Sequence, residues 1–347
     1  MRRFIKVAAF IFSVVLLAGL AAGAMKEKPT HLNSGKNVRG CSGCHGTRGA
    51  PSGAKGKDLC FGCHGAHNRR WAKTDIEGLF AKRSKHPVYE TEKYHSGGEE
   101  LPEKLPSAQR HVSCRDCHSA HLSTAAVPWA GSRGYTRGKA RLNKASVEHE
   151  VCYLCHSDSE NLPAGAENMR DAFDPANASY HPVEMIGRNN FVPSLVRGLT
   201  VNSKMTCTDC HGNNDQNGPK GPHGSDYEPL LVAEYRIFES VESPKAYELC
   251  YMCHDRRSIL GDESFPRHRL HVVTQTATCH TCHTAHGSRD NRHLISFDPA
   301  VVGISNTGLG PQYLPGSPAR CYLRCHDIDH NTGGVFRLDG SKAAGSW

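Results

Sequence analysis

Hydrophobic residues are concentrated near the N-terminus and are sparse over the rest of the chain. A nearly continuous apolar run covers Val7–Leu20, a basic segment precedes it, and the small residues Ala22–Gly23–Ala24 follow it. This pattern is typical of a secretory signal peptide, here residues 1–24. Because a run of about 14 apolar residues is shorter than the roughly 20 that a membrane-spanning helix needs, we expect export without a membrane anchor. No later segment is apolar enough to predict a membrane span.

The remaining hydrophobic pattern predicts only short helices. Thr74–Arg83 has an amphipathic helical pattern, and Arg141–Glu150 predicts a helix that runs into a cysteine pair. Ser243 is positioned to cap a helix that opens at Pro244 and runs into Cys250. No run alternates convincingly between apolar and polar residues, as a half-buried strand would. We therefore expect a mostly irregular fold with short α-helices, long loops and little β-structure.

The composition indicates that something other than protein fills the interior. Mean hydropathy is −0.53, aromatic residues make up 7%, and 34 glycines with 19 prolines give 53 residues in a chain of 347. Such a chain cannot bury a normal hydrophobic core by itself. We therefore expect a bound apolar group to supply the missing volume, and the polypeptide to be largely unfolded without it.

All sixteen cysteines occur in pairs, and each pair is followed directly by a histidine. Seven pairs read C-x-x-C-H: Cys41/Cys44/His45, Cys60/Cys63/His64, Cys114/Cys117/His118, Cys152/Cys155/His156, Cys207/Cys210/His211, Cys250/Cys253/His254 and Cys279/Cys282/His283. The eighth, Cys321/Cys325/His326, is one residue longer. The C-x-x-C-H sequence is the signature of haem c attachment: the thiols bond to the haem vinyl groups and the histidine binds the iron.

Other uses of paired cysteines explain the pattern less well. Zinc sites also use C-x-x-C pairs but do not need a histidine after each one. Eight such histidines by chance have odds of roughly 10⁻⁹ to 10⁻¹⁰ at this composition. A redox C-x-x-C normally occurs once, and a disulfide framework spaces its cysteines more widely. The sequence therefore predicts eight covalently attached haem c groups, the eighth with a non-standard spacing.

The motifs repeat in units of two. A unit has one motif, often a histidine three residues after its last residue, a variable loop, a second motif and a later histidine often set in H-P-V. The expected units are residues 25–112, 113–205, 206–273 and 274–347. Irregular loop lengths favour one continuous, elongated array, as in repeat proteins.

Repeat position also selects candidates for the second axial ligand of each iron. Seven histidines hold such positions: His86, His121, His181, His223, His271, His286 and His330. For unit one, His67 and His31 compete, because the position three residues after His45 is Arg48. His268 competes with His271. Weaker candidates are His95, His111, His149, His280 and His293.

The chain resembles the doubled C-x-x-C-H multihaem cytochromes of metal-respiring bacteria. The residues that carry the resemblance are the paired motifs, the H-P-V histidines and the C-H-x-A-H-G-S turn at His283–Ser288, and they span nearly the whole chain after residue 24. Arg48 and the extra residue in the last motif depart from the pattern. The resemblance implies bis-histidine haems in a chain. It also implies a location in the periplasm, at the outer membrane or outside the cell, with other multihaem cytochromes, an outer-membrane porin or further copies in a filament as partners.

A bis-histidine haem has no open position, so it transfers electrons and does not bind a substrate. We therefore expect an exported electron-transfer cytochrome and not an enzyme. The alternatives are a filament subunit, or a reductase of nitrite, hydroxylamine or sulfur oxyanions with one open haem in unit one. The formal charge of +8 falls to +5 (8 − 3) without the three basic residues of the signal peptide, and about sixteen haem propionates would offset it further. The charge therefore gives no reason to expect a nucleic-acid partner.

Overall fold

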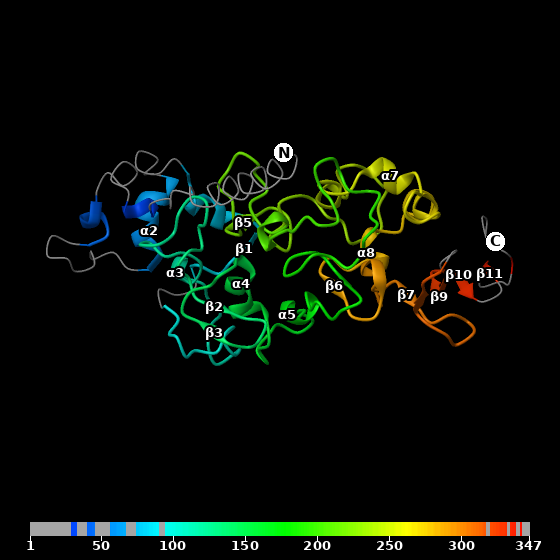
Figure 1. Ribbon diagram of the computed structural model, residues 1–347, viewed down its shortest axis with the longest axis horizontal. Coiled ribbons are helices and arrows are strands. Elements are labelled where there is room, and N and C mark those ends of the chain that lie inside the picture. Colours follow the sequence, from blue (N-terminus) through cyan, green and yellow to red (C-terminus); the bar gives the residue numbers. More distant parts are fainter. Residues whose placement is uncertain are drawn as a thin grey trace, which may run out of the picture.

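A computed structural model describes residues 29–32, 40–45, 56–66, 74–89, 94–316, 320–331, 334–337 and 341. The molecule is elongated, and the chain progresses along its length from the N-terminal helices to a C-terminal sheet (Figure 1). Most of the chain is loop and turn between short helices, which confirms the expected fold class. Within the described ranges, no helix combines the length and the apolar character needed to cross a bilayer. The expected signal peptide lies outside the described residues.

Seven cysteine motifs lie on a short helix or on a single helical turn. The α-helices are α2 (Gly56–His64), α3 (Cys114–Cys117), α4 (Glu148–His156), α5 (Met169–Ala172), α6 (Glu248–Tyr251), α7 (Arg256–Leu260) and α8 (Cys279–Cys282). The 3-10 helices are η1 (Thr30–Leu32), η2 (Gly40–Gly43), η4 (Glu77–Ala81), η5 (Cys207–Asp209) and η7 (Arg292–Leu294), and η6 (Leu270–Thr274) is a π-helix. A helical turn places residues i and i+3 on one side, about 5–6 Å apart, so both thiols of a C-x-x-C sequence face the same group.

The predicted helices are shorter in the structure. Thr74–Arg83 contains only η4. The first half of Arg141–Glu150 is wrong as a helix, since Arg141–Leu142 is strand β3 and α4 begins only at Glu148. The Glu150 carboxylate accepts a hydrogen bond from the Ser146 backbone N–H at 2.6 Å, which stabilises this later start. Ser243 Oγ accepts from the Ala246 N–H at 3.1 Å, but that turn precedes α6 and is not part of it.

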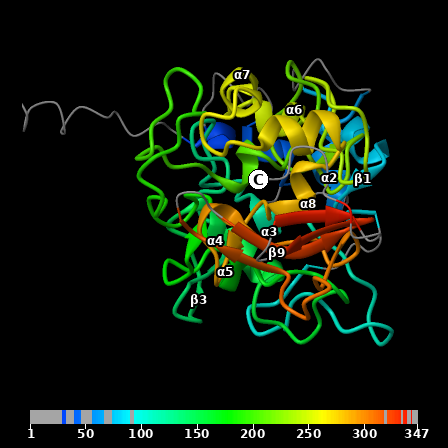
Figure 2. The ribbon, with the colours of Figure 1, turned by 90° about the vertical axis from the view of Figure 1, so that its right-hand side faces the viewer.

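In the described part of the chain, the β-structure consists of three two-stranded ribbons and one larger sheet. The ribbons pair β1 (Ser84–Lys85) with β5 (Gly224–Ser225), β2 (Gly134–Tyr135) with β3, and β4 (Ser179–Tyr180) with β6 (Gly287–Ser288). The sheet contains β7 (Val302–Gly303), β8 (Gln312–Leu314), β9 (Arg320–Cys325), β10 (Ile328–Asn331) and β11 (Gly334–Arg337). Its order is β11-β10-β9-β7, with β8 also paired to β9, and it forms one end of the molecule (Figure 2).

The sequence shows no convincing strand pattern near the C-terminus, yet β7 to β11 form a sheet there. Strand β9 carries the eighth cysteine motif, and its two buried residues are the adjacent Tyr322 and Leu323, so burial along it does not alternate. Alternating burial is the signal that identifies a half-buried strand in a sequence, and β9 lacks it.

Buried side chains form three small clusters in place of a common core. One cluster contains Tyr153, Phe173, Tyr180 and Val183, a second Ala246, Tyr247, Leu260 and Val272, and a third Phe61, Phe80 and Val88. Cysteines of the attachment motifs pack against two of them, Cys207 on the first and Cys250 and Cys279 on the second. The protein core is thus divided among the motifs, as expected when bound haems complete the packing.

Candidate haem-binding sites

Seven of the eight motif histidines face a second imidazole across the space of one metal ion. The ring centroids of these pairs are 6.0–6.5 Å apart: His45–His121, His64–His31, His118–His223, His156–His86, His211–His286, His254–His181 and His283–His268. Two metal–nitrogen bonds of about 2.0 Å, with each ring centre about 1.1 Å behind its nitrogen, put the centroids about 6.2 Å apart. The observed separations therefore fit one iron between each pair of rings.

Hydrogen bonds at Nδ1 orient several of these rings. His118 donates to Pro128 O at 2.8 Å and His211 donates to Pro229 O at 2.9 Å. Among the histidines that face a motif histidine, His86 donates to Pro222 O at 2.7 Å. An Nδ1 that donates its proton to a carbonyl leaves Nε2 as the free electron pair, which is the form of imidazole that binds a metal.

Burial keeps the imidazoles neutral. It is the largest cause lowering the pKa of His156, His223, His254 and His268 to about 4, with nearby imidazoles adding to the effect. Burial also lowers the pKa of His64, His86, His181, His211 and His283. A neutral imidazole can bind iron at neutral pH without first releasing a proton.

Two backbone ribbons each carry two of the facing histidines. His86 follows β1 and His223 precedes β5, so the β1–β5 ribbon serves the fourth and third motifs. His181 and His286 flank the β4–β6 ribbon in the same way and serve the sixth and fifth motifs.

A backbone hydrogen bond joins the two segments that face the first two motifs, and a helical turn takes this role near the last two motifs. The Thr30 N–H donates to Ser123 O at 3.0 Å, which brings His31 and His121 together for the second and first motifs. In the last two motifs, His268 precedes η6 and His271 lies in it. Each pair of neighbouring motifs therefore draws its second ligands from one local structure.

The glycine of each H-G-S turn permits a close backbone approach. A Cβ on Gly224 would lie 1.8 Å from Leu79 O, and a Cβ on Gly287 would lie 1.8 Å from Ala172 O. Real Cβ contacts this short do not occur, so only glycine allows these two ribbons to pack as they do.

Consecutive motifs are neighbours in space from the first to the eighth. The first cysteines of motifs two and three, four and five, and six and seven are neighbours: interaction with the adjacent thiol is the largest cause that raises the pKa of Cys60 beside Cys114, of Cys152 beside Cys207 and of Cys279 beside Cys250. In the alternate steps another thiol of the next motif is close, and burial followed by that thiol raises one pKa in each pair. The second cysteines are neighbours in three of these pairs, Cys44 near Cys63, Cys155 near Cys117 and Cys210 near Cys253, and in the fourth Cys282 lies near Cys321, the first cysteine of the eighth motif. The spatial order of the motifs is thus their order in the sequence.

The eighth motif is built differently. His326 lies in the exposed turn between β9 and β10 and its Nε2 is hydrogen-bonded to the Glu239 carboxylate. His330 instead faces His271, with centroids 6.0 Å apart. His330, a candidate second ligand, therefore does not face the histidine of its own motif.

Strand register explains the arrangement of the eighth motif. Successive side chains of a strand alternate between its faces, so Cys321, Leu323 and Cys325 share one face of β9. His330 is paired with Leu323 across the β9–β10 ladder and therefore emerges on that same face. The extended strand separates the two cysteines by about 13 Å, so bonding both of them to one haem requires the strand to shorten.

The structure also places the histidines whose roles the sequence left open. His67 lies outside the described residues, and His31 faces His64 in unit one. His268 and His271 do not compete, because each faces a different ring. Among the weaker candidates, His149 packs on Tyr153, His280 on Tyr235 and His293 on Tyr313, while His95 and His111 face each other.

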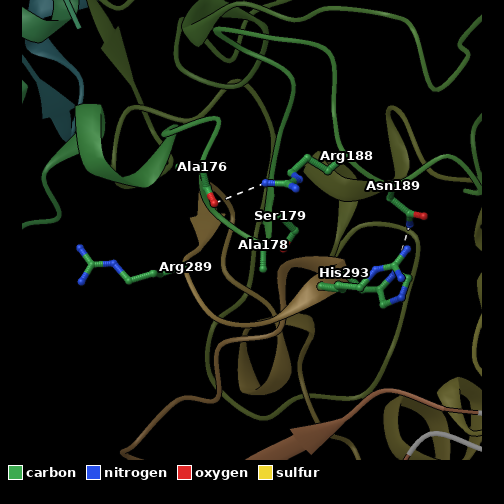
Figure 3. Close-up of a pocket in the computed structure, with 8 residues that line it drawn as sticks. Ala176, Ala178, Ser179, Arg188, Asn189, Arg289 and His293 are labelled. Carbon is green, nitrogen blue, oxygen red and sulfur yellow. Dashed lines mark hydrogen bonds between the residues drawn. The ribbon is translucent and has the colours of Figure 1, made fainter. Parts of the chain in front are cut away.

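A cationic cavity of about 500 Å³ lies beside the seventh motif (Figure 3). Its lining consists of Ala176, Ala178, Ser179, Arg188, Asn189, Arg289, Arg292 and His293. The backbone oxygen of His293 accepts a hydrogen bond from Nδ1 of His283 at 2.9 Å, which connects the cavity wall to the histidine of the seventh motif. Guanidinium groups bind carboxylates well, and three arginines line the cavity.

The family described as "Doubled CXXCH motif" matches residues 200–258, which include the motifs that end at His211 and His254. No curated protein and no solved structure gives a significant match to the chain.

Proposed function

We propose that the chain is a multihaem c-type cytochrome whose eight motifs hold eight haems, and that electrons pass along them in the order of the sequence. The single observation that carries this proposal is the set of imidazole pairs spaced for one iron each, in motifs that are neighbours from first to last. Haem supplies the electron chemistry, while the protein sets the spacing, the axial ligands and the exposure of each haem.

In the proposed ligand set, seven motif histidines bind iron opposite their facing partners. The eighth iron lies between His271 and His330, with His326 left at the surface. The cationic cavity around Arg188 and Arg289 is placed to bind a haem propionate near the seventh motif.

Electron transfer fits this ligand set better than reduction of a substrate. A multihaem reductase needs one haem with an open position, and unit one was the place where the ligand set was uncertain. In the structure, His45 faces His121 and His64 faces His31, so both motifs of that unit have two imidazoles. The described residues therefore offer no obvious open haem for a reductase.

The proposal also includes the cellular setting. Residues 1–24 would direct export, so that haem attachment and electron transfer take place in the periplasm, at the outer membrane or outside the cell. Other multihaem cytochromes would be the electron donors and acceptors. A porin or further copies of this chain are the proposed partners at the outer membrane.

Electron paramagnetic resonance of the air-oxidised protein tests the proposal, together with a count of haems per chain. The ring planes of the first, third, fifth and seventh pairs differ by 8°, 18°, 21° and 40°, and those of the second, fourth and sixth by 89°, 70° and 55°. Nearly parallel imidazoles give rhombic low-spin signals, and nearly perpendicular ones give signals with a much larger anisotropy. We expect eight haems, both low-spin classes and no high-spin iron. A stoichiometric high-spin signal would overturn the proposal in favour of a reductase.

A further inference from the structure

A second cluster of metal-binding side chains lies apart from the haem ligands. His95, Glu103 and His111 each contribute a ligand atom, and these atoms lie within 4.8 Å of one another. All three residues are more than nine-tenths buried, with exposed fractions of 9%, 6% and 8%. They belong to the segment 94–112, which contains no helix or strand.

The hydrogen bonds of the cluster direct its donor atoms inward. His95 Nδ1 bonds to Asp116 Oδ2 at 3.0 Å, and His95 Nε2 lies 3.0 Å from Glu103 Oε1. His111 Nδ1 contacts the same Glu103 oxygen. If Nδ1 of His95 donates its proton to Asp116, the Nε2 lone pair points at a carboxylate oxygen, and two electron-rich atoms face each other unless a positive charge lies between them.

The charges around the cluster favour the binding of a cation. Glu103 and Asp116 bring two negative charges. The guanidinium of Arg133 lies 3.5 Å from Asp116 and also bonds the backbone oxygens of Ser96 and His95, and Arg110 donates to the backbone oxygen of Glu103 at 3.4 Å. Among the described residues, the Glu103 carboxylate forms ion pairs with the two histidines and with no arginine or lysine. His111 Nε2 is buried and has no hydrogen-bond partner. An unpartnered polar atom in a buried cluster is rare in proteins and needs a partner that the protein chain itself does not provide.

We propose that His95, Glu103 and His111 bind one divalent first-row transition metal ion, with Asp116 orienting His95. Two imidazoles and one carboxylate are a common donor set for zinc and non-haem iron. A carboxylate bonded to the outer nitrogen of a metal-binding histidine is the usual second partner in such sites. The ion fastens the irregular segment 94–112 to α3, because Asp116 lies between Cys114 and Cys117 of the third motif.

A proton is the competing source of positive charge. The hydrogen bond to Asp116 is the largest cause raising the pKa of His95 to about 9, so a protonated His95 would satisfy both carboxylates without a metal. The two alternatives differ in what the cluster does when a metal is offered.

The test uses the haem-loaded protein with Zn²⁺ as the probe. After treatment with a chelator and reloading, elemental analysis should find one zinc per chain in addition to the haem iron. The zinc X-ray absorption spectrum should show imidazole and oxygen ligands without sulfur. Glu103→Gln should weaken zinc binding at least about tenfold. The matched control is Glu100→Gln, three residues away on the surface, which should bind zinc as the wild type does.

Three results would overturn the proposal. The stripped protein takes up no zinc, as expected if His95 holds a proton; zinc binds equally well to Glu103→Gln; or the absorption spectrum shows sulfur ligands, which would place the zinc at cysteines. If the Glu103→Gln variant fails to attach its haems, the His111→Gln variant replaces it in the comparison. The zinc X-ray absorption spectrum of the wild-type protein tests the proposal even if neither variant folds.

Discussion

Replacing Gly287 by alanine should detach the second ligands of two neighbouring haems. The added Cβ would lie 1.8 Å from Ala172 O, and real Cβ contacts start at 3.0 Å, so β6 must move by at least 1.2 Å (3.0 − 1.8). His286 precedes this glycine, and its hydrogen-bonded partner strand leads into His181. A shift of that size is large compared with a metal–nitrogen bond of about 2.0 Å, so we expect the bonds from His286 and His181 to their irons to break.

The assay is electron paramagnetic resonance of the oxidised Gly287→Ala variant, with the haem content measured in the same sample. Between one and two of the eight haems should become high-spin, namely the fifth and sixth. The control is Gly98→Ala, where the added Cβ meets no atom within 4 Å, and it should keep the wild-type spectrum. A Gly287→Ala protein with eight low-spin haems and unchanged signals would refute the conclusion that this ribbon positions the two ligands.

Two further predictions concern the eighth and fifth haems. His330→Ala should turn one haem in eight high-spin. His326→Ala should leave every haem low-spin and change the unfolding free energy by no more than about 1 kcal/mol, because it removes only an exposed ion pair with Glu239. The opposite pattern would show that His326, and not His330, binds the eighth iron. His286 is bonded through Nδ1 to the Glu167 carboxylate at 2.8 Å, which favours ferric iron, so Glu167→Gln should raise the potential of the fifth haem. An exposed ion pair worth about 0.5–1 kcal/mol converts to about 20–40 mV for one electron, and spectroelectrochemistry that finds a lower potential would contradict this.

The predicted cofactor follows from short-range sequence. A haem c attachment site uses two cysteines and a histidine within five consecutive residues, so its chemistry can be read without knowing the fold. Composition predicted the loose, irregular architecture for a similar reason, because a chain with too few apolar residues cannot form a protein-only core. The repeat also identified His286, which precedes β6, and His181, which follows β4, as candidate ligands, but it did not predict which motif histidine each of them faces.

The helix predictions were less successful where tertiary contacts decide the boundary. Arg141–Leu142 has a helical pattern but pairs with β2, and β9 forms a strand although its burial does not alternate. In both cases, strand pairing with distant residues outweighs a weak local preference.

Only the tertiary structure decided which histidines face each other and in what order the motifs are arranged. His118 faces His223 because the β1–β5 ribbon joins segments far apart in the chain, and His45 faces His121, which is also distant in sequence. In the eighth motif, the register of β9 and β10 turns His330 toward His271 and leaves His326 at the surface. Attachment of haem depends on residues next to each other in sequence, whereas the second ligand depends on where two distant strands meet, and only the folded chain determines that meeting point.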